Sequence, residues 1–136
     1  MPTLSHTTTL RVRYADTDQM GIVYYAKYLE YFEVARTETL RAIGLPYAQL
    51  EQLGFMLPVA DASIKYSNGA AYDDEIDITA TLEPSNSPRV PITYRAIRKK
   101  DGVLLAEGST TLVFVNRETN RPCKPPALYL EKVGLV

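Results

Sequence analysis

Two aspartates lie in a short loop just before a long helical pattern. Asp16 and Asp18 belong to residues 15–22, a segment with the composition of a loop that leads into a helix. A carboxylate can act as a base or as a nucleophile, and the unpaired backbone amides at a helix start can stabilise negative charge on a reacting oxygen. We therefore predict that this loop forms a reactive site, made of a carboxylate and the unpaired amides at the helix start, around Tyr25 and Ala26.

Less specific roles compete with this one. A loop aspartate before a helix is most often a cap or turn residue, and for Asp16 we favour a turn or supporting role. Two carboxylates without a further His or Glu close by make a poor cation site, so we expect no metal. The single histidine, His6, lies near the amino terminus, which leaves a Ser-His-Asp or Cys-His mechanism without a base. The sequence has no glycine-rich phosphate or dinucleotide motif, and we expect no cofactor.

A single long helix is predicted to follow the loop, over residues 26–43. Its apolar residues recur at three- and four-residue spacing and form one stripe: Tyr28, Leu29, Phe32, Ala35, Leu40 and Ile43. Gly44 and Pro46 supply a stop signal. A shorter helix is expected next, with Pro46 near its start and Gly54 at its end.

The rest of the chain has the two-residue alternation that is typical of half-buried strands. The expected strands cover residues 7–14, 60–66, 76–82, 90–99 and 103–115, and a short element with Leu128, Leu130 and Val133 docks at the end. Asp101 and Gly102 mark a tight hairpin, whereas Pro91 suits an edge or a strand start because it lacks an amide donor. This pattern predicts an α+β fold with an antiparallel sheet packed on one helix.

Composition limits the remaining choices. With 136 residues, 46% of them hydrophobic, the chain is expected to form one domain over residues 1–136. The 15 basic and 16 acidic side chains give a net charge of -1, which does not favour nucleic acid as a partner. No apolar run approaches the length of about 18 residues that a membrane span needs. Cys123 is the only cysteine and the first residues do not form a secretory signal, so we expect the cytoplasm.

Residues 14–28 carry a more specific pattern: Asp-x-Asp, then Gly21, two branched apolar residues, an aromatic pair and Tyr28 at fixed spacing. This pattern resembles the signature of the hotdog-fold acyl-CoA thioesterases of the 4-hydroxybenzoyl-CoA and Tol-Pal-associated types. Further parts of the match are Glu33-x-x-Arg36-x-Glu38, Tyr66, Tyr72-Asp73-Asp74, Asn116-Arg117-Glu118-Thr119 and Arg121-Pro122. The resemblance implies a hotdog fold, in which a sheet of five or six strands wraps around the long helix, and hydrolysis of a coenzyme A thioester.

The resemblance also implies roles for individual residues. The carboxylate at the position of Asp18 is catalytic in the family, as base or as nucleophile, and the backbone amide at Tyr25 polarises the carbonyl. Many Tol-Pal-associated members have a histidine where this chain has Tyr25, which leaves the proton chemistry to Asp18. Gly69 stands where a proline is common. An acyl-CoA substrate is expected, and a homodimer or homotetramer with the active pocket near the subunit boundary.

Three questions stay open from the sequence. A cluster of tyrosines near the helix start suits the core or a dimer interface better than a ligand pocket: Tyr24, Tyr25, Tyr28 and Tyr31. A basic run is either a solvated surface or a site for the coenzyme A phosphates: Arg95, Arg98, Lys99 and Lys100. The acyl chain is not predicted. The alternative function is a non-enzymatic dimer that binds acyl groups, since fold does not dictate function; a hotdog dehydratase would need a histidine that the loop lacks.

Overall fold

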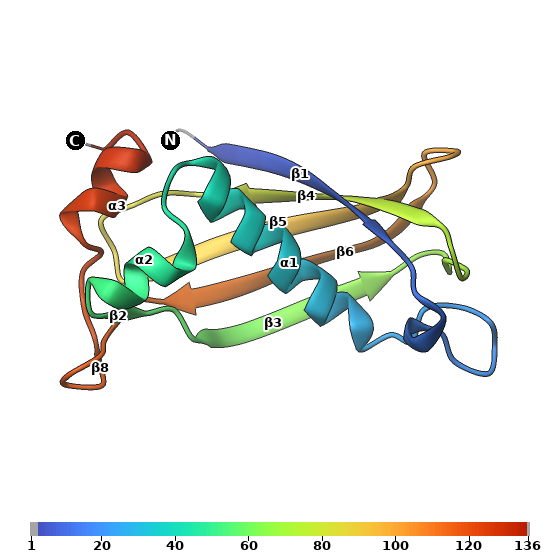
Figure 1. The fold of residues 1–136 in the computed structure, drawn as a ribbon, viewed down its shortest axis with the longest axis horizontal. Helices are drawn as coiled ribbons and strands as arrows, with labels where there is room; N and C mark the ends of the chain where they lie inside the picture. Colours follow the sequence, from blue (N-terminus) through green and yellow to red (C-terminus); the bar gives the residue numbers. More distant parts are fainter. Residues whose placement is uncertain (1–2, 136) are drawn as a thin grey trace.

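The computed structural model describes residues 3–135. Its main sheet has five antiparallel strands in the order β1-β4-β5-β6-β3 (Figure 1). These strands are β1 (Leu4–Arg11), β3 (Val59–Tyr66), β4 (Glu75–Leu82), β5 (Arg89–Arg98) and β6 (Leu104–Val113). Along β4 and most of β5 every second side chain is buried, which is the alternation predicted for a sheet with one face against the core.

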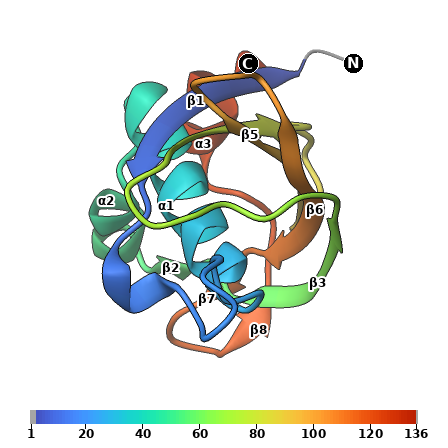
Figure 2. The same ribbon diagram turned by 90° about the vertical axis from the view of Figure 1, so that its right-hand side faces the viewer.

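The long helix α1 (Lys27–Ala42) lies on the concave face of the sheet, and the strands curve around it (Figure 2). The ring of Phe32 stacks on Tyr94 of β5, with centroids 4.4 Å apart and planes 4° apart. Gly108 of β6 permits this approach, because a Cβ at that position would lie 2.6 Å from Cε2 of Phe32. The predicted α+β hotdog fold, a five-stranded sheet wrapped around one long helix, is confirmed.

Two predictions around the helix are wrong in detail. Leu29, predicted in the buried stripe of α1, is exposed, and Tyr31 is buried instead. The first strand ends at Arg11 and not at residue 14, because the backbone turns into a short 3-10 helix, η1 (Tyr14–Asp16). The loop with the two aspartates therefore begins earlier than its sequence pattern indicates.

The strand that contains Pro91 is central, and its predicted edge position is wrong. Its position near the strand start, the other predicted option, is correct. The Pro91 carbonyl accepts a hydrogen bond from the Glu83 amide at 3.3 Å, just beyond the last residue of β4. The nitrogen of Pro91 therefore points toward the chain beyond the last residue of β4. The missing amide donor removes no hydrogen bond between β4 and β5.

A second, three-stranded sheet closes the end of the molecule far from the aspartate loop (Figure 1). It consists of β2 (Phe55–Met56), β7 (Val115–Asn116) and β8 (Arg121–Pro122), flanked by α2 (Tyr47–Gln52) and α3 (Ala127–Lys132). The predicted strand over residues 103–115 is thus divided between β6 and β7. The division occurs at Phe114, which is fully buried and donates its amide to the Pro88 carbonyl at 2.8 Å. Its ring meets the rings of Phe55 and Tyr129 edge-on.

The two edge strands of the main sheet differ in how much of their surface is exposed. The backbone of α1 lies closest to β1 and β4, on one side of the sheet. At the other edge, every residue of β3 is exposed except Ile64, which is half-buried, and Val59 and Tyr66 are each 45% exposed. An uncovered edge with exposed apolar side chains is a ready template for pairing. Within residues 3–135, no helix is long and apolar enough to cross a membrane.

Candidate active site

The aspartate loop is a tight hairpin. Thr17 and Val23 form an isolated antiparallel bridge, and the Asp18 amide donates to the Ile22 carbonyl at 3.0 Å. The Gly21 amide in turn donates to the Asp18 carbonyl at 2.9 Å. Gly21 has a φ of 80°, a left-handed conformation that side chains disfavour. The loop therefore holds the backbone of Asp18 on both sides, immediately before the helix.

The Asp18 side chain lines a cavity of about 300 Å³. Its Oδ1 accepts a hydrogen bond from the Met20 amide at 2.8 Å. Asp18 therefore also stabilises the turn, which is the alternative role expected for a loop aspartate. It does not cap the helix, because the N-cap of α1 is Ala26 and no side chain bonds there. Among residues 3–135, no hydrogen-bond donor reaches the other carboxylate oxygen, Oδ2. One oxygen thus fixes the carboxylate and the other is available for chemistry.

Tyr25 lines the same cavity, at the start of α1. Within the described part of the chain, the amides of Tyr25 and Ala26 donate to no acceptor, whereas the next amide, that of Lys27, donates to the Tyr24 carbonyl at 2.9 Å. The Tyr66 hydroxyl donates to the Tyr25 carbonyl at 2.8 Å and so fixes this peptide from β3. The structure brings together the two predicted catalytic residues and leaves the predicted amides unpaired.

Asp16 is buried and stabilises the loop through hydrogen bonds. Its side chain is 3% exposed, and its Oδ2 accepts a 2.8 Å hydrogen bond from the Tyr31 hydroxyl of α1. The Arg13 guanidinium donates to its Oδ1 at 3.0 Å. Burial opposes ionisation, but the hydrogen bonds from Arg13 and Tyr31 outweigh it and hold the pKa of Asp16 below its ordinary value. The Asp16 carbonyl also accepts from the Tyr24 amide at 2.8 Å, which links this carboxylate to the helix start.

The tyrosine cluster divides into two groups. Tyr28 and Tyr31 are buried, in agreement with the predicted core role, and burial raises the pKa of Tyr28 to about 12. Tyr24 and Tyr25 remain largely exposed, with ring centroids 4.8 Å apart. Tyr25 and Tyr28 also line the Asp18 cavity, so for these two tyrosines the less favoured role, that of a pocket wall, is present as well.

Residues 67–69, the loop after β3, form the far wall of the Asp18 cavity. A Cβ at Gly69 would lie 2.7 Å from Cγ2 of Ile22, so this wall packs directly on the aspartate loop. Arg98 holds it: one guanidinium nitrogen donates to the Gly69 carbonyl at 3.1 Å, and another pairs with Asp101 at 3.0 Å. Lys100, in the same basic run, pairs with Asp74 at 3.5 Å. Arg98 was predictable only as part of a charged surface, because its contact to Gly69 joins residues 29 positions apart.

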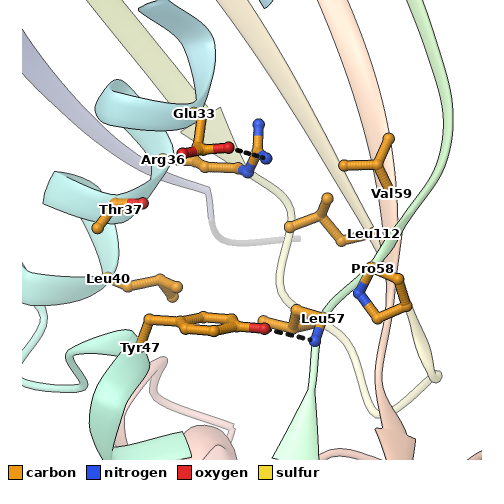
Figure 3. Close-up of a pocket in the computed structure, with 9 residues that line it drawn as sticks. All are labelled: Glu33, Arg36, Thr37, Leu40, Tyr47, Leu57, Pro58, Val59 and Leu112. Carbon is orange, nitrogen blue, oxygen red and sulfur yellow. Dashed lines mark hydrogen bonds and ion pairs between the residues drawn. The ribbon is translucent and has the colours of Figure 1, made fainter. Parts of the chain in front are cut away.

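A second cavity, of about 410 Å³, lies between α1, α2 and the start of β3 (Figure 3). Its lining residues are Glu33, Arg36, Thr37, Leu40, Tyr47, Leu57, Pro58, Val59 and Leu112. It is larger than the Asp18 cavity, but neither predicted catalytic residue lines it. This cavity was not predicted from the sequence, because its walls come from four elements and only the charges of Glu33 and Arg36 are visible in the helix pattern.

Residues 12–133 match the family model described as the thioesterase-like superfamily. This segment includes the aspartate loop and the whole of α1. The chain belongs to the thioesterase-like superfamily. The predicted resemblance to the hotdog thioesterases is confirmed, and with it the expected class of enzyme, a thioester hydrolase.

Individual members of the superfamily match most of the chain. The protein YneP of Bacillus subtilis is 34% identical over 113 residues, which cover 83% of this chain and 81% of that protein. The acyl-CoA thioesterase YbgC of Haemophilus influenzae is 30% identical over 120 residues, 86% of this chain and 85% of that protein. A DHNA-CoA thioesterase from Staphylococcus aureus has the same fold, with a TM-score of 0.83 and 31% identity over 88% of this chain and 80% of its own.

Proposed function

We propose that this protein is a single-domain acyl-CoA thioesterase that hydrolyses a coenzyme A thioester to a free acid and coenzyme A. One observation carries the proposal: Asp18 and Tyr25 line one cavity, and among residues 3–135 the amides at Tyr25 and Ala26 have no acceptor. The acyl-CoA thioesterase activity in the name of the Haemophilus influenzae relative supports it. Cys123 is a free thiol, which suits a reducing compartment, and we place the enzyme in the cytoplasm.

In the proposed mechanism the thioester carbonyl oxygen accepts hydrogen bonds from the amides at the start of α1. The negative charge that develops there is stabilised by donors already in place, a contribution of about 10² to 10³ in rate per donor. The Asp18 carboxylate either attacks the carbonyl carbon or removes a proton from the attacking water, and general base catalysis contributes about 10² to 10⁴. The carbon–sulfur bond then breaks, and the departing thiolate takes up a proton. Where Asp18 itself attacks, the product of this step is an acyl–aspartyl anhydride, and water hydrolyses it to release the free acid and restore the carboxylate.

We also propose that two copies pair through β3. This edge is exposed on both faces, whereas on the opposite edge strand, β1, every second residue is half-buried and the strand contacts α1. A two-fold pairing of β3 with its copy satisfies the free backbone groups and covers Val59 and Tyr66. Since Tyr66 also lines the Asp18 cavity, the pairing places that cavity at the subunit boundary.

The replacement Asp18→Asn tests the mechanism. It keeps the shape of the side chain and removes its charge, so turnover is expected to fall by about 10² to 10⁴. The assay follows released thiol from a panel of aromatic, short-chain and long-chain acyl-CoA substrates. Glu131→Gln in α3, far from the loop, is the matched control and retains wild-type rates. Unchanged turnover in Asp18→Asn contradicts the assigned role.

The same panel separates the enzyme from the non-enzymatic alternative. An acyl-binding dimer shows saturable binding of acyl-CoA with no thiol release from any member of the panel. Thermal unfolding of Asp18→Asn is measured in parallel, and its midpoint is expected to stay close to the wild-type value because the carboxylate makes a single hydrogen bond, to the Met20 amide. A large drop would assign the loss of activity to misfolding.

A further inference from the structure

The cavity in Figure 3 contains an arginine whose charge is only partly balanced. The Arg36 side chain is 15% exposed and extends from α1 toward β3 and β6. Among residues 3–135, its one ion pair is with the Glu33 carboxylate at 3.9 Å, beyond hydrogen-bond distance. That carboxylate is 70% exposed, so water screens its charge. A largely buried guanidinium with donors to spare favours a second anionic partner.

A second donor and apolar walls complete the cavity. The Tyr47 hydroxyl accepts a hydrogen bond from the Leu57 amide at 3.2 Å, which leaves its own proton free to donate. The other walls are mainly aliphatic: Leu40, Leu57, Pro58, Val59 and Leu112. A cavity of this kind fits a hydrocarbon chain that ends in a carboxylate, with the chain against the aliphatic walls and the carboxylate at Arg36 and Tyr47.

The position of the cavity suggests where such a chain comes from. Val59, at the start of β3, lines this cavity, and Tyr66, at the end of β3, lines the Asp18 cavity. Within one protomer the two strand ends are about 23 Å apart, at about 3.3 Å per residue. If β3 pairs with its own copy across a two-fold axis, the strands run antiparallel, and Tyr66 of one protomer lies near Val59 of the other. The Asp18 cavity of each protomer then meets the Arg36 cavity of its partner.

We propose that Arg36 and Tyr47 of one protomer bind the distal carboxylate of an acyl group whose thioester is held at Asp18 of the other protomer. The substrates of this class are coenzyme A monothioesters of dicarboxylic acids. The inference rests on the proposed function and extends it, because it names the acyl group and the residues that select it. It also makes each active site depend on both chains.

The first test compares acyl-CoA pairs of equal chain length that differ only at the far end. Hexanoyl-CoA and adipoyl-CoA form one pair, and octanoyl-CoA and suberoyl-CoA form the next. The measured quantity is the ratio of kcat/KM for the carboxylate-ended over the methyl-ended member. We expect a ratio above one in the wild type for at least one pair, and a drop in that ratio of about 10- to 100-fold in Arg36→Met, because hydrogen bonds to charged groups are among the strong ones.

Two further variants make this comparison specific. Arg41→Met changes the same residue type on the same helix, but Arg41 is exposed and pairs with Glu38, so the ratio is expected to stay at the wild-type value. Tyr47→Phe keeps the ring and removes the second donor, with an expected drop of about 2- to 10-fold. It also provides the answer if Arg36→Met fails to fold.

A mixed dimer tests whether the contact crosses the subunit boundary. One protomer carries Asp18→Asn with Arg36 intact, the other carries Arg36→Met with Asp18 intact, and two different tags isolate the mixed species. Its only working Asp18 faces the intact Arg36 of the partner, so the wild-type ratio is expected to return. A ratio equal to that of the Arg36→Met homodimer overturns the contact between protomers.

The outcomes separate the two proposals. If the wild type hydrolyses methyl-ended substrates and shows no preference for their carboxylate-ended partners, or if Arg36→Met changes both members of a pair equally, the selection by Arg36 is wrong and the thioesterase stands. If no acyl-CoA of either kind releases thiol, the proposed function itself fails.

Discussion

The Tyr31 hydroxyl donates a 2.8 Å hydrogen bond to the buried Asp16 carboxylate, and Tyr31→Phe removes this bond while it keeps the ring. A hydrogen bond to a charged group contributes about 1.5 to 3 kcal/mol, and we expect the free energy of unfolding to fall by about 2 kcal/mol at pH 7. At a urea dependence of about 2 kcal/mol per M, the unfolding midpoint moves down by about 1 M. Because the Asp16 carbonyl holds the Tyr24 amide, kcat is expected to fall as well.

The pH dependence of this loss distinguishes the charged hydrogen bond from a general packing defect. The pKa of Asp16 is lowered in the folded protein, so the group contributes stability above its unfolded pKa of about 4. That contribution disappears as the pH falls through the folded pKa, when the carboxyl becomes neutral and its bond to Tyr31 weakens. The difference between wild type and Tyr31→Phe is therefore largest at pH 7 and decreases as the pH falls below about 4 and through the folded pKa.

Urea unfolding at pH 7 and at a series of pH values below 4 measures this difference, with Tyr72→Phe as the control. Tyr72 is exposed and its hydroxyl takes part in no hydrogen bond among residues 3–135, so its loss is expected to change stability by less than about 0.5 kcal/mol. A Tyr31→Phe effect no larger than that of the control, or one that does not decrease at any point of the acidic pH series, refutes the assigned interaction.

Two other substitutions test single contacts, one that holds the site and one between the sheet and α1. Tyr66→Phe removes the hydroxyl that holds the Tyr25 carbonyl, and we expect kcat of the thioesterase reaction to fall about 2- to 10-fold, with little change in the thermal midpoint. Gly108→Ala places a methyl group 2.6 Å from the Phe32 ring and 2.8 Å from the Ser63 carbonyl, and urea unfolding is expected to show a loss of about 1 to 3 kcal/mol. Wild-type kcat in the first variant, or wild-type stability in the second, contradicts the respective contact.

The helix and the strands were predictable because their patterns are local. The alternation in β4 and the stop signal after α1 lie within a few residues of the elements that they define. The helix has one exception: its periodicity predicted that Leu29 is buried, but Leu29 is exposed and Tyr31 is buried. A tyrosine can be buried when its hydroxyl has a partner. The partner, Asp16, lies 15 residues earlier and cannot be seen from helical spacing.

The candidate site was predictable only where its residues lie close together in the sequence. Asp18 and Tyr25 share one loop and its helix, so their proximity follows from the chain itself. Tyr66 and Arg98 reach the cavity wall from β3 and β5, and their contacts depend on strand order and register, which no local pattern reveals. The Arg36 cavity has the same origin, because α1, α2, β3 and β6 each supply part of it.

The Asp-x-Asp pattern shows how one change of backbone conformation separates two roles. In an extended strand, residues two apart face the same side, and Asp16 and Asp18 would lie together. Here Asp16 is the last residue of η1, and the chain becomes extended only at Thr17, with φ -95° and ψ 157°. The two carboxylates consequently line different cavities: Asp16 meets Arg13 and Tyr31, whereas Asp18 shares its cavity with Tyr25. Asp16 thus pairs its charge with structural partners inside the protein, whereas Asp18 keeps one carboxylate oxygen without a donor among residues 3–135.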